Sequence, residues 1–162
     1  MKIVYHCPEK LDRSQHYVRL ASWFGCGFLS PAPGTWGSLG GLAWGVVVAG
    51  LLGVYGLFIG IFIVSVIGYW AAGRFDDALG TQDSKMIVID EVAGQWIAMI
   101  PALGSLTLIL LSFLLFRLFD ITKPWPVSYF ENDVKGPAGV MGDDIVAGMM
   151  AAVCVLVVGY VF

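Results

Sequence analysis

The chain has 162 residues, of which 58% are hydrophobic and 13% are charged, and its mean hydropathy is +0.81. The charged share is about half that of an ordinary soluble domain. This composition excludes a disordered chain, and a formal net charge of −3 excludes a basic nucleic-acid-binding protein. The length fits a single domain over residues 1–162, and the apolar excess predicts a protein that lies partly in lipid.

The first element expected in chain order is an interfacial helix over residues 12–25, and hydrophobic helices follow it. Turn residues separate those helices near 53–56 and 101–105, and Pro124 and Pro126 end the fourth one. The expected hydrophobic helices cover about residues 37–52, 57–73, 87–100, 105–121 and 143–162. The predicted fold is all-α, a compact bundle of four to five hydrophobic, mostly membrane-spanning helices with an N-terminal interfacial helix.

All charged residues fall in three short windows, at 2–19, 74–91 and 117–144. The expected helices place these windows on one side of a membrane and the two uncharged turns on the other. Lys and Arg mark the cytoplasmic side. We therefore expect the charged side to face the cytoplasm, with a soluble all-α bundle as the alternative.

Three groups of acidic residues lie at the charged ends of the expected helices. They are Asp90 with Glu91, then Asp120, and then Asp143 with Asp144. Because all three groups are expected at one depth, we expect them to converge. Small residues follow both acidic pairs, in the segments 92–94 and 145–148, and these should let the helices approach closely. Clustered carboxylates repel one another unless a cation neutralises them, and Mg²⁺ binds such oxygens and often bridges to phosphate. For Asp143 and Asp144, stabilisation by a helix N-terminus is the alternative.

Groups that suit an anion lie on the same side. Arg117 shares a helix face with Asp120, and Lys123 follows it by about one turn, so both cations are candidate phosphate contacts. The turn before the first hydrophobic helix contains Thr35, Gly37 and Ser38. A glycine-rich helix N-terminus can hold an anion, and helix capping is the alternative.

These residues predict metal-dependent chemistry on an anion at the membrane surface. The chain has two histidines and no motif for a covalent histidine or aspartate intermediate, so attack by a water molecule that the metal activates is the simpler hypothesis. Asp76, Asp77 and Asp83 are expected in a solvated loop. A membrane ion or proton transporter and a non-catalytic membrane partner protein stay open as other classes.

Four segments in order resemble the phosphatidylglycerophosphatase A family of bacterial lipid phosphatases. They are residues 27–38 (GFLSPAPGTWGS), 87–98 (IVIDEVAGQWIA), 116–126 (FRLFDITKPWP) and 142–148 (GDDIVAG). The resemblance implies Mg²⁺-dependent removal of the terminal phosphate of phosphatidylglycerophosphate, a phospholipid substrate. Another lipid phosphate such as phosphatidic acid is the closest alternative.

The residue roles within that family site are our own hypothesis. Asp90, Glu91, Asp143 and Asp144 are expected to hold Mg²⁺, with Asp120 as a further ligand or a base. Arg117 and Lys123, together with Thr35, Gly37 and Ser38, are expected to bind the phosphate. Glycines four residues apart, Gly41 with Gly45 and Gly56 with Gly60, suit close helix contacts in lipid. Such small-residue helix faces permit a homo-oligomer without requiring one.

Overall fold

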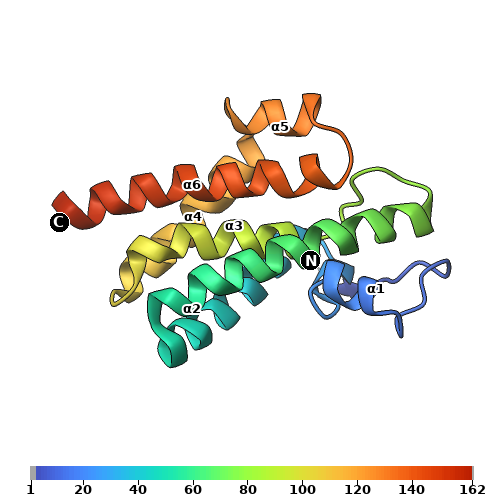
Figure 1. The fold of residues 1–162 in the computed structure, drawn as a ribbon, viewed down its shortest axis with the longest axis horizontal. Coiled ribbons are helices and arrows are strands. Elements are labelled where there is room, and N and C mark those ends of the chain that lie inside the picture. Colours follow the sequence, from blue (N-terminus) through green and yellow to red (C-terminus); the bar gives the residue numbers. More distant parts are fainter. Residues whose placement is uncertain (1–2, 162) are drawn as a thin grey trace.

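The computed structural model describes residues 3–161 and confirms an all-α architecture (Figure 1). A short antiparallel pair, β1 (Val4–Tyr5) with β2 (Leu29–Ser30), and two 3₁₀ turns, η1 (Cys26–Phe28) and η2 (Ile100–Ala102), complete the described elements. The α-helices are α1 (His16–Ala21), α2 (Pro33–Leu79), α3 (Ile89–Met99), α4 (Leu106–Thr122), α5 (Val127–Asp133) and α6 (Pro137–Val161).

Helix α2 consists of two arms that meet at Gly53, where the chain reverses (Figure 1). Gly53 has φ 65° and ψ −163°, a conformation that is open to glycine and strained for other residues. The predicted turn is therefore confirmed. Both arms were predicted too short at their outer ends. Helix α2 begins at Pro33, a residue suited to a first helical turn, and it continues beyond Gly73 through the charged residues that follow, to Leu79.

Helix α3 lies at the centre of the bundle, against α2, α4 and α6. Its contact with the first arm of α2 uses glycines, since Gly41 lies against Val92 and Gly45 against Trp96. The Trp96 indole N–H donates to the Gly41 carbonyl at 2.6 Å. Close approach through small residues, expected from the Gly41 and Gly45 spacing, is confirmed.

Helices α3 and α6 approach most closely where Gly94 faces Gly148. A side chain on Gly148 would collide with the Gly94 backbone, and one on Gly94 would collide with the Asp144 carbonyl and the Phe116 ring. This contact carries the acids of both helices to one level. The small residues that follow each acidic pair therefore act as predicted.

Two further predicted boundaries were wrong, and one helix was missed. The interfacial helix predicted over 12–25 is helical only over His16–Ala21, because the chain turns at Trp23 and Phe24, both with positive φ. Helix α6 begins at Pro137 instead of near Asp143. Helix α5, which packs on α6, was not predicted.

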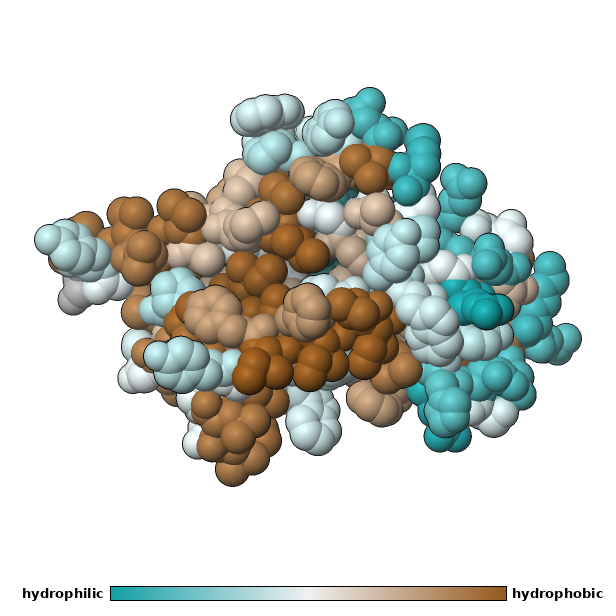
Figure 2. Space-filling view, viewed as in Figure 1, coloured by the Kyte–Doolittle hydropathy of each residue, from teal (hydrophilic) through white to brown (hydrophobic). Residues whose placement is uncertain are grey.

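The surface divides into a polar end and an apolar remainder. Polar residues gather at one end of the long axis, and apolar residues cover the other half (Figure 2). Helices α2 and α6 are long and apolar enough to cross a membrane. Helix α3, with 11 residues, is about 17 Å long at 1.5 Å per residue, shorter than a bilayer core.

Candidate active site

The polar end of the bundle contains a cavity of about 380 Å³. It lies where the beginnings of α2 and α3, the end of α4 and the second turn of α6 meet. Seven carboxylates and three cations line it, so negative charge is in excess. The carboxylates are those of Asp83, Asp90, Glu91, Asp120, Glu131, Asp143 and Asp144, and the cations are Lys85, Arg117 and Lys123. The predicted convergence of the acids is confirmed.

Three of these acids form a tight group. One carboxylate oxygen from each of Asp90, Glu91 and Asp144 lies within 4.8 Å of the other two. Glu91 Oε2 and Asp144 Oδ1 are buried and have no hydrogen-bond partner among the described residues. Buried polar groups are normally paired, so these oxygens indicate a missing partner. An all-oxygen, anionic donor set of this kind suits Mg²⁺.

Two other acids are already paired with cations. Arg117 Nη1 lies 2.5 Å from Asp120 Oδ2 and 3.9 Å from Glu91 Oε1. Lys123 Nζ donates to Asp143 Oδ2 at 2.5 Å. Asp143, predicted as a metal ligand, therefore contacts Lys123, and the three-carboxylate group forms without it.

The pKa of Lys123 reflects this environment. Burial alone would lower the pKa of the ammonium, but the hydrogen bond from Lys123 to Asp143 and the charges of Asp143 and Asp144 outweigh it. The net effect raises the pKa above its ordinary value. Lys123 is thus held as a cation beside the three-carboxylate group. Glu131 of α5, 3.4 Å from Nζ, adds a further contact that the sequence did not indicate.

The start of α2 contributes through Ser38 and Gly34. The Ser38 hydroxyl donates to the Gly34 carbonyl at 2.8 Å and accepts from Arg117 Nη1 at 3.3 Å. A Cβ on Gly34 would collide with Glu91 Oε1 and lie 3.1 Å from Arg117 Nη1. Ser38 therefore orients Arg117, and Gly34 leaves space for both charged groups.

The other two predicted phosphate contacts lie elsewhere. Gly37 packs against Val88, where a Cβ would meet the valine side chain at 2.5 Å. Thr35 is absent from the cavity lining, and its N–H and that of Trp36 donate to the Ala32 carbonyl. Because α2 begins at Pro33, these residues lie inside the helix instead of in an open turn.

The loop between α2 and α3 forms one wall of the cavity through Asp83, Ser84 and Lys85. Asp76, expected to be solvated, is buried and holds this loop. Its carboxylate accepts from the Asp83 N–H at 2.8 Å and the Ser84 N–H at 3.1 Å. Burial raises the pKa of Asp83, against the opposing charge of Lys123. In the sequence, the polar segment 80–85 after the second hydrophobic helix was the signal that could have indicated that this loop lines the site.

The position of α6 weakens the alternative explanation for its acids. A helix N-terminus stabilises negative charge only over its first turn. Asp143 and Asp144 lie in the second turn of α6, which begins at Pro137. Stabilisation by the helix dipole therefore does not account for two buried carboxylates at this point. The arrangement is suited to hold a divalent cation next to Arg117 and Lys123, which can neutralise phosphate oxygens.

The chain is similar to known proteins over most of its length. Residues 19–159 match the family model described as Phosphatidylglycerophosphatase A. The chain is 41% identical to phosphatidylglycerophosphatase A of Haemophilus influenzae over 143 residues, covering 87% of each protein. It is 32% identical to the Escherichia coli protein of that name over 154 residues, covering 94% of this chain and 88% of the relative.

A third relative carries a different name. The chain is 33% identical over 153 residues to a Bacteroides thetaiotaomicron protein named as a proposed phosphatidylinositol-3-phosphatase, covering 89% of this chain and 94% of the relative. No solved structure matches the chain. The family match spans most of the chain and includes every acid of the cavity. The chain therefore belongs to the phosphatidylglycerophosphatase A family of phosphoric monoester hydrolases.

Proposed function

We propose that this protein hydrolyses the terminal phosphomonoester of phosphatidylglycerophosphate to phosphatidylglycerol and phosphate, in a Mg²⁺-dependent reaction at the cytoplasmic face of the inner membrane. The observation that carries the proposal is the group formed by Asp90, Glu91 and Asp144. These carboxylates lie within 4.8 Å of one another, beside two cations and inside a matched family segment.

In this proposal Asp90, Glu91 and Asp144 hold the metal ion. When bound, Mg²⁺ supplies a Lewis acid that stabilises phosphoryl charge and lowers the pKa of a water molecule. Two buried carboxylate oxygens without partners support this assignment. Asp143, which contacts Lys123, is assigned to positioning that cation, and its role as a ligand stays a prediction.

The two cations bind the phosphate in this proposal. Arg117 presents a planar guanidinium that Asp120 and Ser38 hold in place. Lys123 supplies a second positive charge from the end of α4. Phosphoryl transfer depends mainly on positioning and charge stabilisation, so these groups are sufficient in kind. The role of Asp120 as a proton acceptor stays a prediction, because its carboxylate contacts Arg117.

An exposed apolar residue, Ile121, lies at the edge of this polar cavity, and we assign it to the path by which the lipid substrate enters from the bilayer. Ile121 belongs to the cavity lining, yet 67% of it is exposed, and Trp125 just beyond it is 80% exposed. Exposed apolar side chains at a polar site are suited to the boundary between headgroup and acyl chains. We assign the entry path to the gap beside Ile121, between the start of α2 and the end of α4.

A membrane orientation follows from the aromatic residues and the charges. Tyr69 and Trp70 are exposed on α2 towards the polar end, while Tyr55 and Tyr160 are exposed towards the opposite end. Aromatic residues favour the two membrane interfaces, and Lys and Arg favour the cytoplasmic side. These preferences support a polar end that faces the cytoplasm. The acids line a cavity at that end instead of lying at the bilayer midplane, which disfavours a transporter.

The deciding experiment measures phosphate release by the purified protein in neutral detergent. Phosphatidylglycerophosphate, phosphatidic acid and phosphatidylinositol 3-phosphate are tested separately, each with Mg²⁺ and with chelator. We expect chelator-sensitive release that is fastest from phosphatidylglycerophosphate. The phosphatidylinositol arm is included because of the name of the Bacteroides relative. Faster release from another lipid would move the substrate assignment, and folded protein without release from any of them would contradict the proposal.

A further inference from the structure

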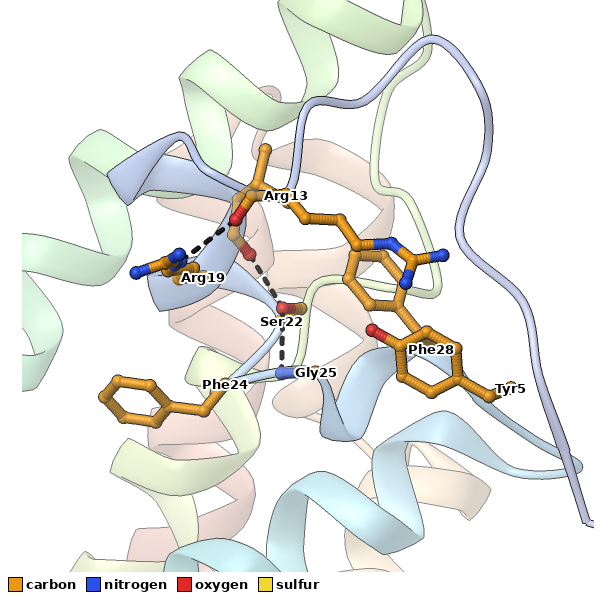
Figure 3. Close-up of a pocket in the computed structure, with 8 residues that line it drawn as sticks. Tyr5, Arg13, Arg19, Ser22, Phe24, Gly25 and Phe28 are labelled. Carbon is orange, nitrogen blue, oxygen red and sulfur yellow. Dashed lines mark hydrogen bonds between the residues drawn. The ribbon is translucent and has the colours of Figure 1, made fainter.

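A second cavity, of about 330 Å³, lies in the N-terminal part of the chain between β1, α1 and η1. It shares no lining residue with the acidic cavity. Arg13 with Tyr5 lies on one side of it, and Arg19 with Phe24 lies on the other (Figure 3). The cavity thus has an arginine and an aromatic residue on each of two opposite sides, and the reaction proposed above uses none of these residues.

The two arginines lack acidic partners. Neither Arg13 nor Arg19 forms an ion pair within residues 3–161. The Arg13 guanidinium lies 4.9 Å from the centre of the Tyr5 ring, and Arg19 Nε donates to the Arg13 carbonyl at 3.0 Å. The neighbouring Asp12 accepts from the Ser14 N–H and hydroxyl, both at 2.8 Å. The contact with Tyr5 positions Arg13, and the hydrogen bond to the Arg13 carbonyl positions Arg19. The Arg19 charge also acts on the nearby Asp12 carboxylate, but neither arginine is held in an ion pair within residues 3–161.

The rim of this cavity is apolar and exposed. Phe24 is 67% exposed and Tyr5 47% exposed, whereas Phe28 is buried at 4%. Phe24 has φ 56°, which is uncommon for a bulky residue. The ring points outward and away from the cavity in Figure 3. An outward aromatic beside free cations is typical of a surface that contacts lipid.

Contacts along α2 give the depth of this surface. Gly34 lies against Glu91 at the acidic cavity, and Gly40 lies against Trp23. At 1.5 Å per residue these contacts are about 9 Å apart along the helix, with Trp23 further into the apolar half. Trp23 directly precedes Phe24. With the acidic cavity at the membrane interface, Phe24 therefore reaches the acyl region, and Arg13 and Arg19 lie near the headgroups.

We propose that this cavity binds the phosphodiester headgroup of an anionic phospholipid. Arg13 and Arg19 contact the phosphate oxygens in charge-assisted hydrogen bonds, and Phe24 lies among the acyl chains. The bound lipid holds β1 and α1 against the bilayer. The inference rests on the membrane placement in the proposed function and is independent of the reaction catalysed at the acidic cavity.

The test measures the thermal midpoint Tm of the purified full chain in neutral detergent. The added probes are dioleoylphosphatidylglycerol, dioleoylphosphatidylcholine and inorganic phosphate. We expect saturating phosphatidylglycerol to raise the Tm of the wild type by about 5 °C, and the double variant Arg13→Gln/Arg19→Gln by less than about 1 °C. The matched control Lys10→Gln/Arg74→Gln removes two exposed charges outside both cavities and keeps the full shift.

Three results would overturn the site: an equal Tm shift in Arg13→Gln/Arg19→Gln, an equal loss in the control variant, or an equal arginine-dependent shift with inorganic phosphate. If the double variant does not fold, phenylglyoxal modification of the wild type replaces it. Phosphatidylglycerol should then slow modification of Arg13 and Arg19 at least about threefold and leave Arg74 unchanged. Release of the chain from membranes by alkaline carbonate would instead contradict the membrane placement.

Discussion

Helices α3 and α6 pack closely along their length, but they bury apolar side chains at one end of the pair and carboxylates at the other. Towards the apolar end, Ala98, Ala151 and Val155 are buried, and their apolar side chains need no polar partner. At the polar end, the same two helices bring Glu91 and Asp144 together, each with a buried oxygen that has no hydrogen-bond partner within residues 3–161. Burial stabilises the first group, whereas it costs free energy for unpartnered carboxylates.

This difference shows how the bundle can hold an unfavourable group of charges. The contact between Gly94 and Gly148 joins the two ends, and it fixes the helix separation on both sides at once. Burial of apolar side chains at one end stabilises the folded state, and this contribution offsets the free-energy cost of holding carboxylates close together at the other. Sites that violate local rules of stability in this way are commonly functional.

The largest expected effect follows from removing one charge of the three-carboxylate group. Asp144→Asn should lower kcat/KM for phosphatidylglycerophosphate about 10³-fold, the upper range for one electrostatic contact in a transition state. In chelator its Tm should equal or exceed that of the wild type, because one source of repulsion is gone. Phosphate release and thermal unfolding in detergent measure both quantities.

The matched control for this variant is Asp133→Asn, an exposed acid at the end of α5. It changes the net charge equally and should retain wild-type kcat/KM within about twofold, as expected for a surface substitution. Full activity of a folded Asp144→Asn protein would remove Asp144 from the site. A fall in Tm without loss of activity would make its role structural.

The second prediction concerns the contact between Gly94 and Gly148, which lies between the two ends of the helix pair. Gly148→Ala places a Cβ against the Gly94 carbonyl, with Gly94 Cα and C both 2.9 Å away. Because backbone atoms cannot turn aside, we expect destabilisation by about 3 kcal/mol and a Tm lower by about 6–12 °C. Gly50→Ala is the control, since a Cβ there would meet no described atom within 4 Å apart from its chain neighbours and the backbone of its own helix. Equal Tm values for the two variants would contradict the proposed role of the contact.

The third prediction concerns the metal ion. Mg²⁺ at about one hundred times its dissociation constant should raise the Tm of the wild type by about 5–10 °C, because binding to the folded state alone adds to stability. The shift should fall to near zero in Asp144→Asn and persist in Asp133→Asn. An identical shift in all three proteins would place the binding of Mg²⁺ outside the three-carboxylate group.

The convergence of the acids could be predicted because the positions of charged residues along an apolar chain indicate how deep each helix end lies in the membrane. Asp90, Glu91 and Asp144 each lie next to an uncharged stretch, so one orientation in a membrane brings them to one level. The small residues that follow them predicted the close approach of α3 and α6. These inferences need only the chain and the thickness of a bilayer.

The start of α6 and the pairing of Asp143 could not be predicted, since both depend on α5. Gly139 and Gly142 lie inside α6, where Gly139 faces the Val134 carbonyl and Gly142 faces the Phe130 ring. The partner of Asp143 is Lys123, which has a left-handed backbone conformation at the end of α4. No local pattern indicates such a contact, because it depends on how three helices pack.

The smallest expected effect separates a partnered acid at the polar end from the unpartnered group. The Asp76 carboxylate accepts from the Thr81 hydroxyl and from the N–H groups of Asp83 and Ser84. Asp76→Asn replaces one acceptor with a donor, which opposes a backbone N–H. We expect about a tenfold rise in KM with little change in kcat, because the loop that forms one wall of the cavity is displaced. Tm should fall by a few degrees, unlike in Asp144→Asn.

Asp77→Asn provides the comparison, because Asp77 is the next residue on the same helix and is exposed. It should leave KM and Tm unchanged. If Asp76→Asn instead lowered kcat about 10³-fold and raised Tm in chelator, as expected for Asp144→Asn, then Asp76 would belong to the metal-binding group. The hydrogen-bond partners of an acid would then not indicate whether it shapes the loop or binds the metal ion. A tenfold change confined to KM would instead show that hydrogen-bond partners distinguish the acids that shape this end of the bundle from those that carry its chemistry.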